Sequence, residues 1–310
     1  MSGPVTVDDA PPVPDCGHPG AHTVEVTESH EATVGRLKVR RALPRRGRRT
    51  VGAWCFADHM GPASVTEDSG LDVGPHPHIG LQTVTWLLDG EALHRDSLGS
   101  EQVIRPGQLN LMTAGNGVSH SEEATGHYRG ELEGIQLWIA QPDRTRGGAA
   151  GFEHHRELPR QDFTGGVATV LVGEFAGVTS PARHDSPLAG VELDLPGGTA
   201  AFPLRREWEY AAIVLRGSVR LGQHVVEPGH LAYLGDDRDE LELEAAAGTR
   251  ALLLGGEPFA EQIVMWWNFV ARDRDELLAA YRSWRDQDDR FGHLRSPLPR
   301  IPAPAPYWRS

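Results

Sequence analysis

The sequence predicts an all-β protein made of two tandem antiparallel β-barrels, followed by one C-terminal helix. The 310 residues include 36 glycines and 23 prolines, a composition that favours short strands joined by tight turns. From Thr23 to about Gln141 the chain alternates apolar runs with turn residues, as a series of strands does. A weak internal repeat then indicates that a second barrel follows the first.

The chain divides into four predicted parts. Residues 1–22 are polar and rich in proline and glycine, so we expect a disordered lead-in. Residues 23–145 form the first barrel, and residues 146–290 form the second barrel together with the helix. A crossover from about residue 142 to residue 158 joins the barrels. Residues 291–310 contain Pro-x-Pro steps and are expected to form an extended tail.

A strand that begins at His76 is expected to carry the first pair of functional side chains. Side chains two residues apart on a strand point to the same face. His76 and His78 should therefore share a face with Val84, Trp86 and Leu88, which have the character of core residues. The prolines on either side of His76 lack amide donors, so this end of the strand should lie at a barrel rim.

The repeat relates residues 84–90 to residues 211–217. Each run ends in glycine and is followed by a second strand and a Pro-Gly turn, at residues 106–107 and 228–229. Alignment on the paired glycines places Pro203 and Arg205 opposite His76 and His78. Alignment on the Pro-Gly turns places Glu242 and Glu244 opposite His120 and Glu122. Because an arginine in place of a histidine repels a cation, we expect the second barrel to bind no metal.

The last predicted element is a helix that begins after Asp273. Asp273 is the expected N-cap, and Glu276 three residues later completes a capping box. Leu277, Leu278, Tyr281 and Trp284 then form an apolar stripe. The helix should cover one face of a barrel.

The net charge and the number of cysteines argue against several kinds of binding partner and site. The formal charge is −13, from 43 acidic and 30 basic residues, which argues against binding of nucleic acid or of an anionic membrane. Cys16 and Cys55 are the two cysteines, so neither a disulfide framework nor a thiolate metal site is expected. The N-terminus has no basic start or apolar run of a secretory signal. We expect a cytoplasmic monomer.

Two short motifs have the spacing of metal ligands. His76 and His78 are separated by one residue, and so are His120 and Glu122 about forty residues later. If the two strands face each other inside a barrel, they offer three imidazoles and one carboxylate to a single ion. Such a set suits iron, manganese, nickel, copper or zinc and leaves positions open for oxygen or substrate. The alternative is that they are ordinary surface histidines.

The motifs also resemble those of a known family. The stretches at residues 76–85, 94–99, 106–115 and 118–123 resemble the pirin family of the cupin superfamily, and the similarity runs roughly from residue 25 to residue 290. The resemblance implies two tandem cupin barrels of the jelly-roll type, a bicupin, with one metal ion in the first barrel. It carries the metal ligands onto His76, His78, His120 and Glu122, and it implies that the ion is most often Fe(II).

The chain departs from the wider cupin pattern at one point. Many cupins place a ligand glutamate a few residues after the His-x-His pair, where this chain has Gln82 and Thr83. The carboxylate must come from Glu122 instead. Inference from other cupin enzymes should therefore be drawn from the site itself and not from the fold.

The resemblance implies two functions that the sequence leaves open. The first is a metal-dependent oxidoreductase of the quercetin 2,3-dioxygenase type, which cleaves a flavonol or related hydroxylated aromatic with O2. The second is a regulator whose metal redox state controls binding to a transcription factor or a metabolic enzyme. A pocket wide enough for a three-ring aromatic beside the metal would favour the enzyme, whereas a closed site would favour the regulator.

Several roles at the site have competing interpretations. Glu122 is the candidate catalytic base, because it is the one anionic ligand, but it can equally be a permanent ligand that balances charge. Asp58, Asp96, Asn110 and Glu123 are candidate acceptors for the second ring nitrogen of the ligand histidines. The Trp266–Trp267 pair is either an aromatic wall for a flat ligand or a buried strand of the second barrel.

Overall fold

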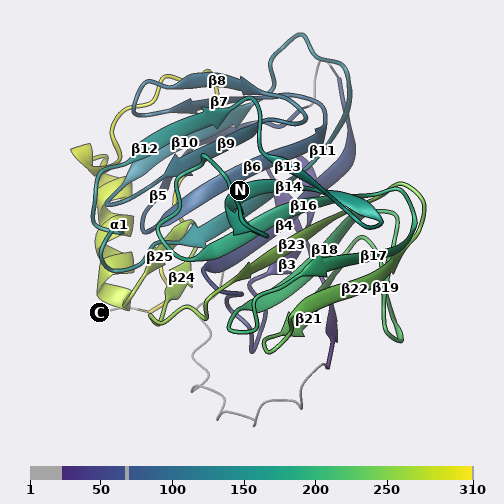
Figure 1. The fold of residues 1–310 in the computed structure, drawn as a ribbon. Helices are drawn as coiled ribbons and strands as arrows, with labels where there is room; N and C mark the ends of the chain where they lie inside the picture. The colour runs from purple at the N-terminus through teal and green to yellow at the C-terminus, as the bar shows by residue number, and fades with distance from the viewer. Residues whose placement is uncertain (1–22, 67–69, 309–310) are drawn as a thin grey trace.

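Two β-barrels lie side by side in the structure, a computed structural model that describes residues 23–66 and 70–308 (Figure 1). The predicted fold class is confirmed: the chain is an all-β bicupin with a C-terminal helix. The predicted lead-in of residues 1–22 and Cys16 lie outside the described residues. None of the helices in the described ranges has both the length and the apolar character needed to cross a membrane.

The first barrel consists of two antiparallel sheets. Its larger sheet has the order β12-β9-β6-β11-β4-β3-β2, and its smaller sheet has the order β5-β10-β7-β8. The strands of the larger sheet are β2 (His30–Val34), β3 (Leu37–Leu43), β4 (Trp54–Val65), β6 (Leu81–Asp89), β9 (Leu109–Thr113), β11 (Gly130–Ala140) and β12 (Gly151–His155). Those of the smaller sheet are β5 (Val73–His78), β7 (Ala92–Asp96), β8 (Glu101–Ile104) and β10 (Val118–Glu123).

The second barrel repeats this arrangement. Its larger sheet has the order β1-β21-β18-β23-β16-β14-β13, with β15 paired to β14, and its smaller sheet has the order β17-β22-β19-β20. The larger sheet contains β1 (Glu25–Glu28), β13 (Arg160–Phe163), β14 (Gly166–Phe175), β15 (Val178–Thr179), β16 (Leu188–Leu195), β18 (Glu209–Arg216), β21 (His230–Gly235) and β23 (Thr249–Gly256). The smaller one contains β17 (Gly198–Pro203), β19 (Val219–Leu221), β20 (His224–Val226) and β22 (Glu240–Ala245).

The two halves of the sequence repeat therefore occupy equivalent places, with β6 and β18 at the same position in their sheets. Two strands cross the division that we expected at residue 145. β1 precedes the first barrel in sequence but pairs with β21 of the second. β12 follows residue 145 but pairs with β9 of the first.

Apolar side chains of the two larger sheets form one core between the barrels. This core includes Trp86 and Leu137 of the first barrel and Ile213 and Leu252 of the second. Trp54 crosses the junction, and its indole N–H donates to the carbonyls of residues 189 and 255, each at 3.2 Å. A Cβ at residue 190 would lie 2.6 Å from the Trp54 ring, so glycine is required there.

The strand predicted from His76 onward is two strands, and the shared face predicted for it is wrong. The chain turns at Gly80, which has φ 67°, between β5 and β6. A Cβ at Gly80 would lie 2.2 Å from the carbonyl oxygen of Val270, so the turn also needs glycine for close packing. Beyond it, Trp86 joins the core between the barrels, whereas Thr85 reaches Glu122 inside the first barrel.

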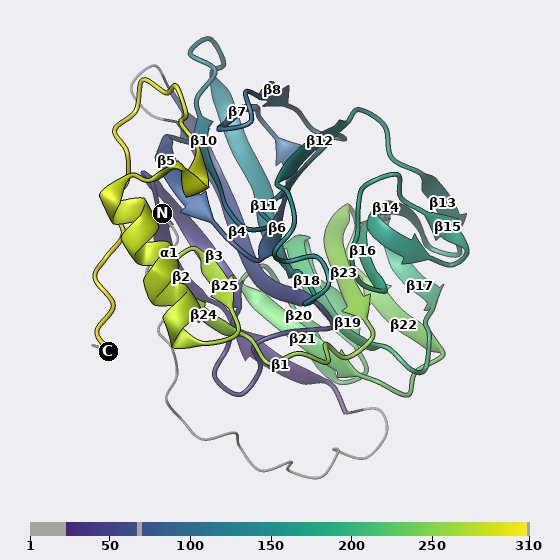
Figure 2. The same cartoon turned by 90° about the vertical axis from the view of Figure 1, so that its left-hand side faces the viewer.

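The C-terminal segment, residues 264–301, packs against the first barrel on the side away from the second (Figure 2). It contains β24 (Val264–Trp266), β25 (Phe269–Ala271), α1 (Arg274–Asp286) and the 3₁₀-helix η1 (Asp289–Phe291), followed by extended chain. The predicted N-cap is confirmed, since the Asp273 carboxylate accepts from the amide of Glu276 at 2.9 Å. Trp266 and Trp267 are buried, but β24 pairs with β25 and not with a second-barrel strand, which corrects that interpretation.

Candidate metal centre

Two neighbouring antiparallel strands bring the predicted histidines together. His76 on β5 lies directly opposite His120 on β10, and His78 is two residues further along β5. The three side chains are 6%, 1% and 1% exposed, respectively. One ring nitrogen from each belongs to a group of ligand atoms that all lie within 4.8 Å of one another. The alternative of ordinary surface histidines is therefore wrong for these three residues.

Backbone carbonyls fix the orientation of two of the rings. Nδ1 of His76 donates to the carbonyl of Gly74 at 2.9 Å, and Nδ1 of His78 donates to the carbonyl of Asn268 at 3.0 Å. Because a carbonyl can only accept, Nδ1 carries the proton and Nε2 keeps its lone pair. Nε2 of His78 lies 3.0 Å from Nε2 of His120, so these nitrogens face a common point.

Burial keeps the imidazoles neutral. It lowers the pKa of His78 to about 3, and it lowers the pKa values of His76 and His120 well below their usual range. Desolvation is the main cause, since it penalises the charged imidazolium. Neutral imidazoles whose ring nitrogens converge on one point are good ligands for a divalent transition metal, so the residues fit such an ion.

Glu122 lies beside the histidines in the same cavity. It follows His120 by two residues on β10, across an irregularity in the pairing with β5. Burial raises the pKa of its carboxyl, and the hydroxyl of Thr85 donates to its Oε1 at 3.5 Å. The close group of ligand atoms comprises the three histidines without Glu122. Its carboxylate is thus near the centre but outside the tightest cluster.

The space beside the histidines is small. The cavity measures about 30 Å³, room for about one water molecule. Its walls include side chains from the larger sheet, namely Val39, Phe56, Asp58, Met60, Gln136 and Trp138. Pockets that hold drug-sized ligands are usually on the order of 300–1,000 Å³. A three-ring aromatic would enter only if part of this lining moved.

None of the four predicted carboxylate or amide acceptors orients a ligand histidine through a described contact. Asp58 forms a buried bidentate ion pair with Arg41, at 2.7 and 2.6 Å. The other three bond elsewhere: Asp96 to His94, Asn110 to His154, and Glu123 to Ser121 and Ser296. The acceptors for His76 and His78 are main-chain carbonyls, which every residue carries and no sequence motif marks.

The corresponding strands of the second barrel present different side chains. Glu242 and Glu244 on β22 are exposed, whereas Leu241 and Leu243, which alternate with them along the strand, fill the barrel. Arg205 forms an ion pair with Glu174. Within residues 23–66 and 70–308, the three histidines of the first barrel are the one group of this kind.

Comparison with known protein families agrees with this architecture. The family model for pirin matches residues 36–139, and the model for the pirin C-terminal cupin domain matches residues 190–292. The chain belongs to the pirin family.

Individual relatives cover nearly the whole chain. A Pseudomonas aeruginosa protein named "Putative quercetin 2,3-dioxygenase" is 46% identical over 95% of this chain and 94% of its own length. A Caulobacter vibrioides pirin-like protein is 37% identical over 84% of this chain and 92% of its own length. The crystal structure of a quercetin 2,3-dioxygenase from Acinetobacter baumannii is 43% identical, with a TM-score of 0.89 over 93% of this chain and 97% of that one.

Proposed function

We propose that this protein is a dioxygenase that uses a divalent metal ion to cleave a flavonol such as quercetin, or a related hydroxylated aromatic, with O2. The observation that carries the proposal is the convergence of three buried, neutral imidazoles in the first barrel. Close relatives named as quercetin 2,3-dioxygenases support the reaction type.

In this proposal His76, His78, His120 and Glu122 hold the ion. A divalent ion bound there would supply Lewis acidity that lowers the pKa of a substrate hydroxyl and would have further coordination positions open. We propose Fe(II), with manganese, nickel, copper and zinc as alternatives. A solved bacterial pirin from Escherichia coli, YhhW, is described in complex with nickel(II), so nickel belongs in any test.

The protein's own groups would bind and deprotonate the substrate. Glu122 is the proposed base for the flavonol 3-hydroxyl, because it is a buried carboxylate next to the imidazole cluster. Phe56 and Trp138 stack with ring centroids 4.0 Å apart in the cavity wall and offer aromatic surface to a flat ligand.

The size of the cavity favours a second candidate, a regulator whose metal state alters a surface for another protein. A space of about 30 Å³ does not admit a three-ring aromatic unless its lining moves. A regulator needs no such opening. The family resemblance includes proteins of this kind, so the enzyme must be tested directly.

The test is an oxygen-uptake and flavonol-bleaching assay. Purified protein is loaded separately with Fe(II), Mn(II), Ni(II), Cu(II) or Zn(II), and the His78→Ala variant is the control. We expect quercetin and O2 to be consumed with at least one ion and not by the variant. If the protein binds metal but is inert with every ion, the enzyme proposal fails and the regulator takes its place.

A further inference from the structure

The C-terminal segment, residues 264–301, belongs to neither barrel, yet it contacts both strands that carry the histidines. β25 lies next to β5, and η1 lies next to β10. The family model for the second cupin domain extends to residue 292, but this part of the match packs on the first barrel. The contacts of the segment with β5 and β10 indicate its role beside the histidines.

On β5 the segment provides the hydrogen-bond acceptor for His78. The hairpin between β24 and β25 reverses at Trp267 and Asn268, and Trp267 adopts φ 53°. A bulky residue in this left-handed region persists only where surrounding structure enforces it. The next carbonyl, that of Asn268, accepts the Nδ1 proton of His78, and the amide of Val270 donates to Ile79 at 3.2 Å.

The extended chain after η1 packs on Gly74, the residue that provides the acceptor for His76. The carbonyl of Gly74 accepts from His76, and the carbonyl oxygen of Pro299 packs directly on Gly74, where a Cβ would lie only 2.1 Å away. The amide of Ile301 donates to the carbonyl of Pro75 at 2.9 Å. The segment thus supplies the acceptor carbonyl for His78 and packs on the residue that supplies the acceptor carbonyl for His76.

The segment also contacts β10, which carries His120 and Glu122. The hydroxyl of Ser119 donates to the carbonyl of Phe291 at 2.9 Å, and the hydroxyl of Ser296 donates to Oε1 of Glu123 at 2.6 Å. These two bonds flank the ligand positions on either side. Arg290 adds a bond from its Nε to the carbonyl of Asn116, just before β10, at 2.8 Å.

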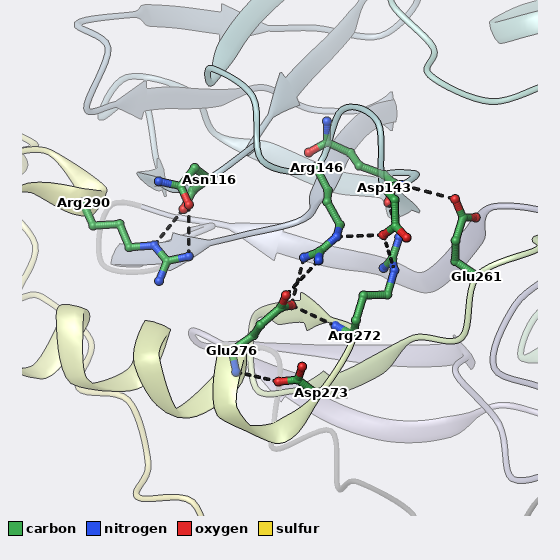
Figure 3. A network of polar contacts seen from close by, with 9 residues as sticks. Asn116, Asp143, Arg146, Glu261, Arg272, Asp273, Glu276 and Arg290 are labelled. Carbon is green, nitrogen blue, oxygen red and sulfur yellow. Dashed lines mark hydrogen bonds and ion pairs between the residues drawn. The ribbon is translucent and has the colours of Figure 1, made fainter.

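A network of ion pairs holds the segment in place (Figure 3). Arg146 forms a bidentate pair with Glu276 in the first turn of α1, with both distances 2.8 Å. Arg272 donates to Asp143 and to the carbonyl of Gln141, each at 2.8 Å. Residues 141–146 directly follow β11, so the network ties the start of α1 to the first barrel.

We propose that the C-terminal segment is a positioning element of the metal centre. It sets the ring orientation of His76 and His78 and fixes the backbone of β10, so that the ligand nitrogens converge before an ion arrives. The inference rests on the proposed metal site, and it adds that a region outside both barrels determines its affinity. Partners that orient ligand side chains typically alter metal affinity by about 10–100-fold when they are removed.

The test removes two bonds between the segment and β10 in the full-length protein. The variant is Ser119→Ala with Ser296→Ala. The matched control is Ser180→Ala in the second barrel, where a buried serine also donates to a carbonyl, that of Leu171, at 2.7 Å. Like Ser296, Ser180 accepts from the amide two residues later.

Two readouts separate positioning from general stability. The first is the Kd for Ni(II), measured by competition with a chelator, and the second is the visible spectrum of Co(II)-loaded protein. We expect the double variant to bind Ni(II) about tenfold more weakly and to show a changed Co(II) spectrum. The control should match wild type in both, and the metal-free double variant should melt no lower than the metal-free control.

Different results would overturn the proposed function and the positioning role of the C-terminal segment. If His78→Ala binds Ni(II) as tightly as wild type, the metal site is elsewhere, and both the proposed function and this inference are overturned. If His78→Ala loses binding but the double variant keeps the wild-type Kd and spectrum, the positioning role alone is overturned. An equal loss of affinity in the Ser180→Ala control would also overturn it.

Discussion

In each proposed ligand histidine on β5 the two ring nitrogens have different roles. Nδ1 of His76 and of His78 is tied to a carbonyl, so Nε2 is left as the donor to an ion. Burial keeps both rings neutral, so the lone pair is available at physiological pH. Glu122 is the proposed carboxylate ligand, and it is also the proposed base.

Replacing Glu122 by Gln separates the role of base from that of ligand. If Glu122 removes the substrate proton, the variant should lose at least about a hundredfold in kcat while still binding measurable metal. The measurement is metal content together with quercetin turnover. Full activity in the variant would exclude Glu122 as the base.

Thr85 is expected to hold the Glu122 carboxylate in place. Its hydroxyl lies 3.5 Å from Oε1 of Glu122 and 3.0 Å from Oε1 of Gln136. Thr85→Val keeps the shape but removes the hydroxyl, and we expect metal affinity to fall by about tenfold. Thr85→Ser should keep the wild-type affinity in the same chelator competition. Equal affinity in all three proteins would show that Thr85 has no such role.

At the residue scale, the sequence predicts the clustering of the three histidines better than it predicts their surroundings. The i, i+2 spacing of His76 and His78 determines that they share a face once β5 forms, and this holds in the structure. Their acceptors could not be predicted, because Asn268 acts through its main chain from 190 residues away. The turn at Gly80 had a visible signal, since glycine inside a strand pattern often marks a bend.

Between the elements of the two barrels lies a buried ionic network. Nε2 of His59 on β4 is 3.1 Å from Oε1 of Glu133 on β11, and Glu133 also pairs with Arg216 on β18 of the second barrel. Burial lowers the pKa of His59, although the hydrogen bond to Glu133 opposes the shift. The folded state therefore disfavours protonation of this histidine relative to the unfolded chain.

This network predicts a loss of stability in acid. The unfolded chain protonates His59 at its usual pKa of 6.5, whereas the folded chain does so only at lower pH. The unfolded state therefore binds more protons below pH 6.5, and the free energy of unfolding falls as the pH drops through that region. Denaturant unfolding of metal-free protein should show a shallower decline for His59→Gln. Identical pH profiles for the two proteins would contradict this.

At the scale of elements, the sequence predicted the duplication because turn residues recur at matching places in the two halves. The equivalent positions of β6 and β18 in their sheets confirm this prediction. The pairing of β1 with the second barrel could not be predicted, because residues 25–28 carry no signal that selects between two similar sheets. The helix was predicted with its Asp273 cap, since this interaction is local, but the Glu276 carboxylate accepts from the amide of Arg272 and does not complete the predicted capping box.

The whole molecule is held together at the junction of the two larger sheets. Trp54 is completely buried there and bonds to two carbonyls of the second barrel. Trp54→Ala should cost about 3–5 kcal/mol of unfolding free energy and allow the barrels to unfold in separate transitions. Denaturant unfolding followed by fluorescence and circular dichroism measures both effects.

Trp208→Ala, within the core of the second barrel, is the control that should destabilise without uncoupling. A single coincident transition in Trp54→Ala would contradict the role of the junction.

We propose that one ion binds among His76, His78, His120 and Glu122. The most direct test is an anomalous difference map from crystals of the protein loaded with Fe(II) or Ni(II). We expect one strong peak per chain, within coordination distance of three imidazole nitrogens and the carboxylate of Glu122, and no peak in the second barrel. A peak elsewhere, or no peak at the histidines, would contradict it.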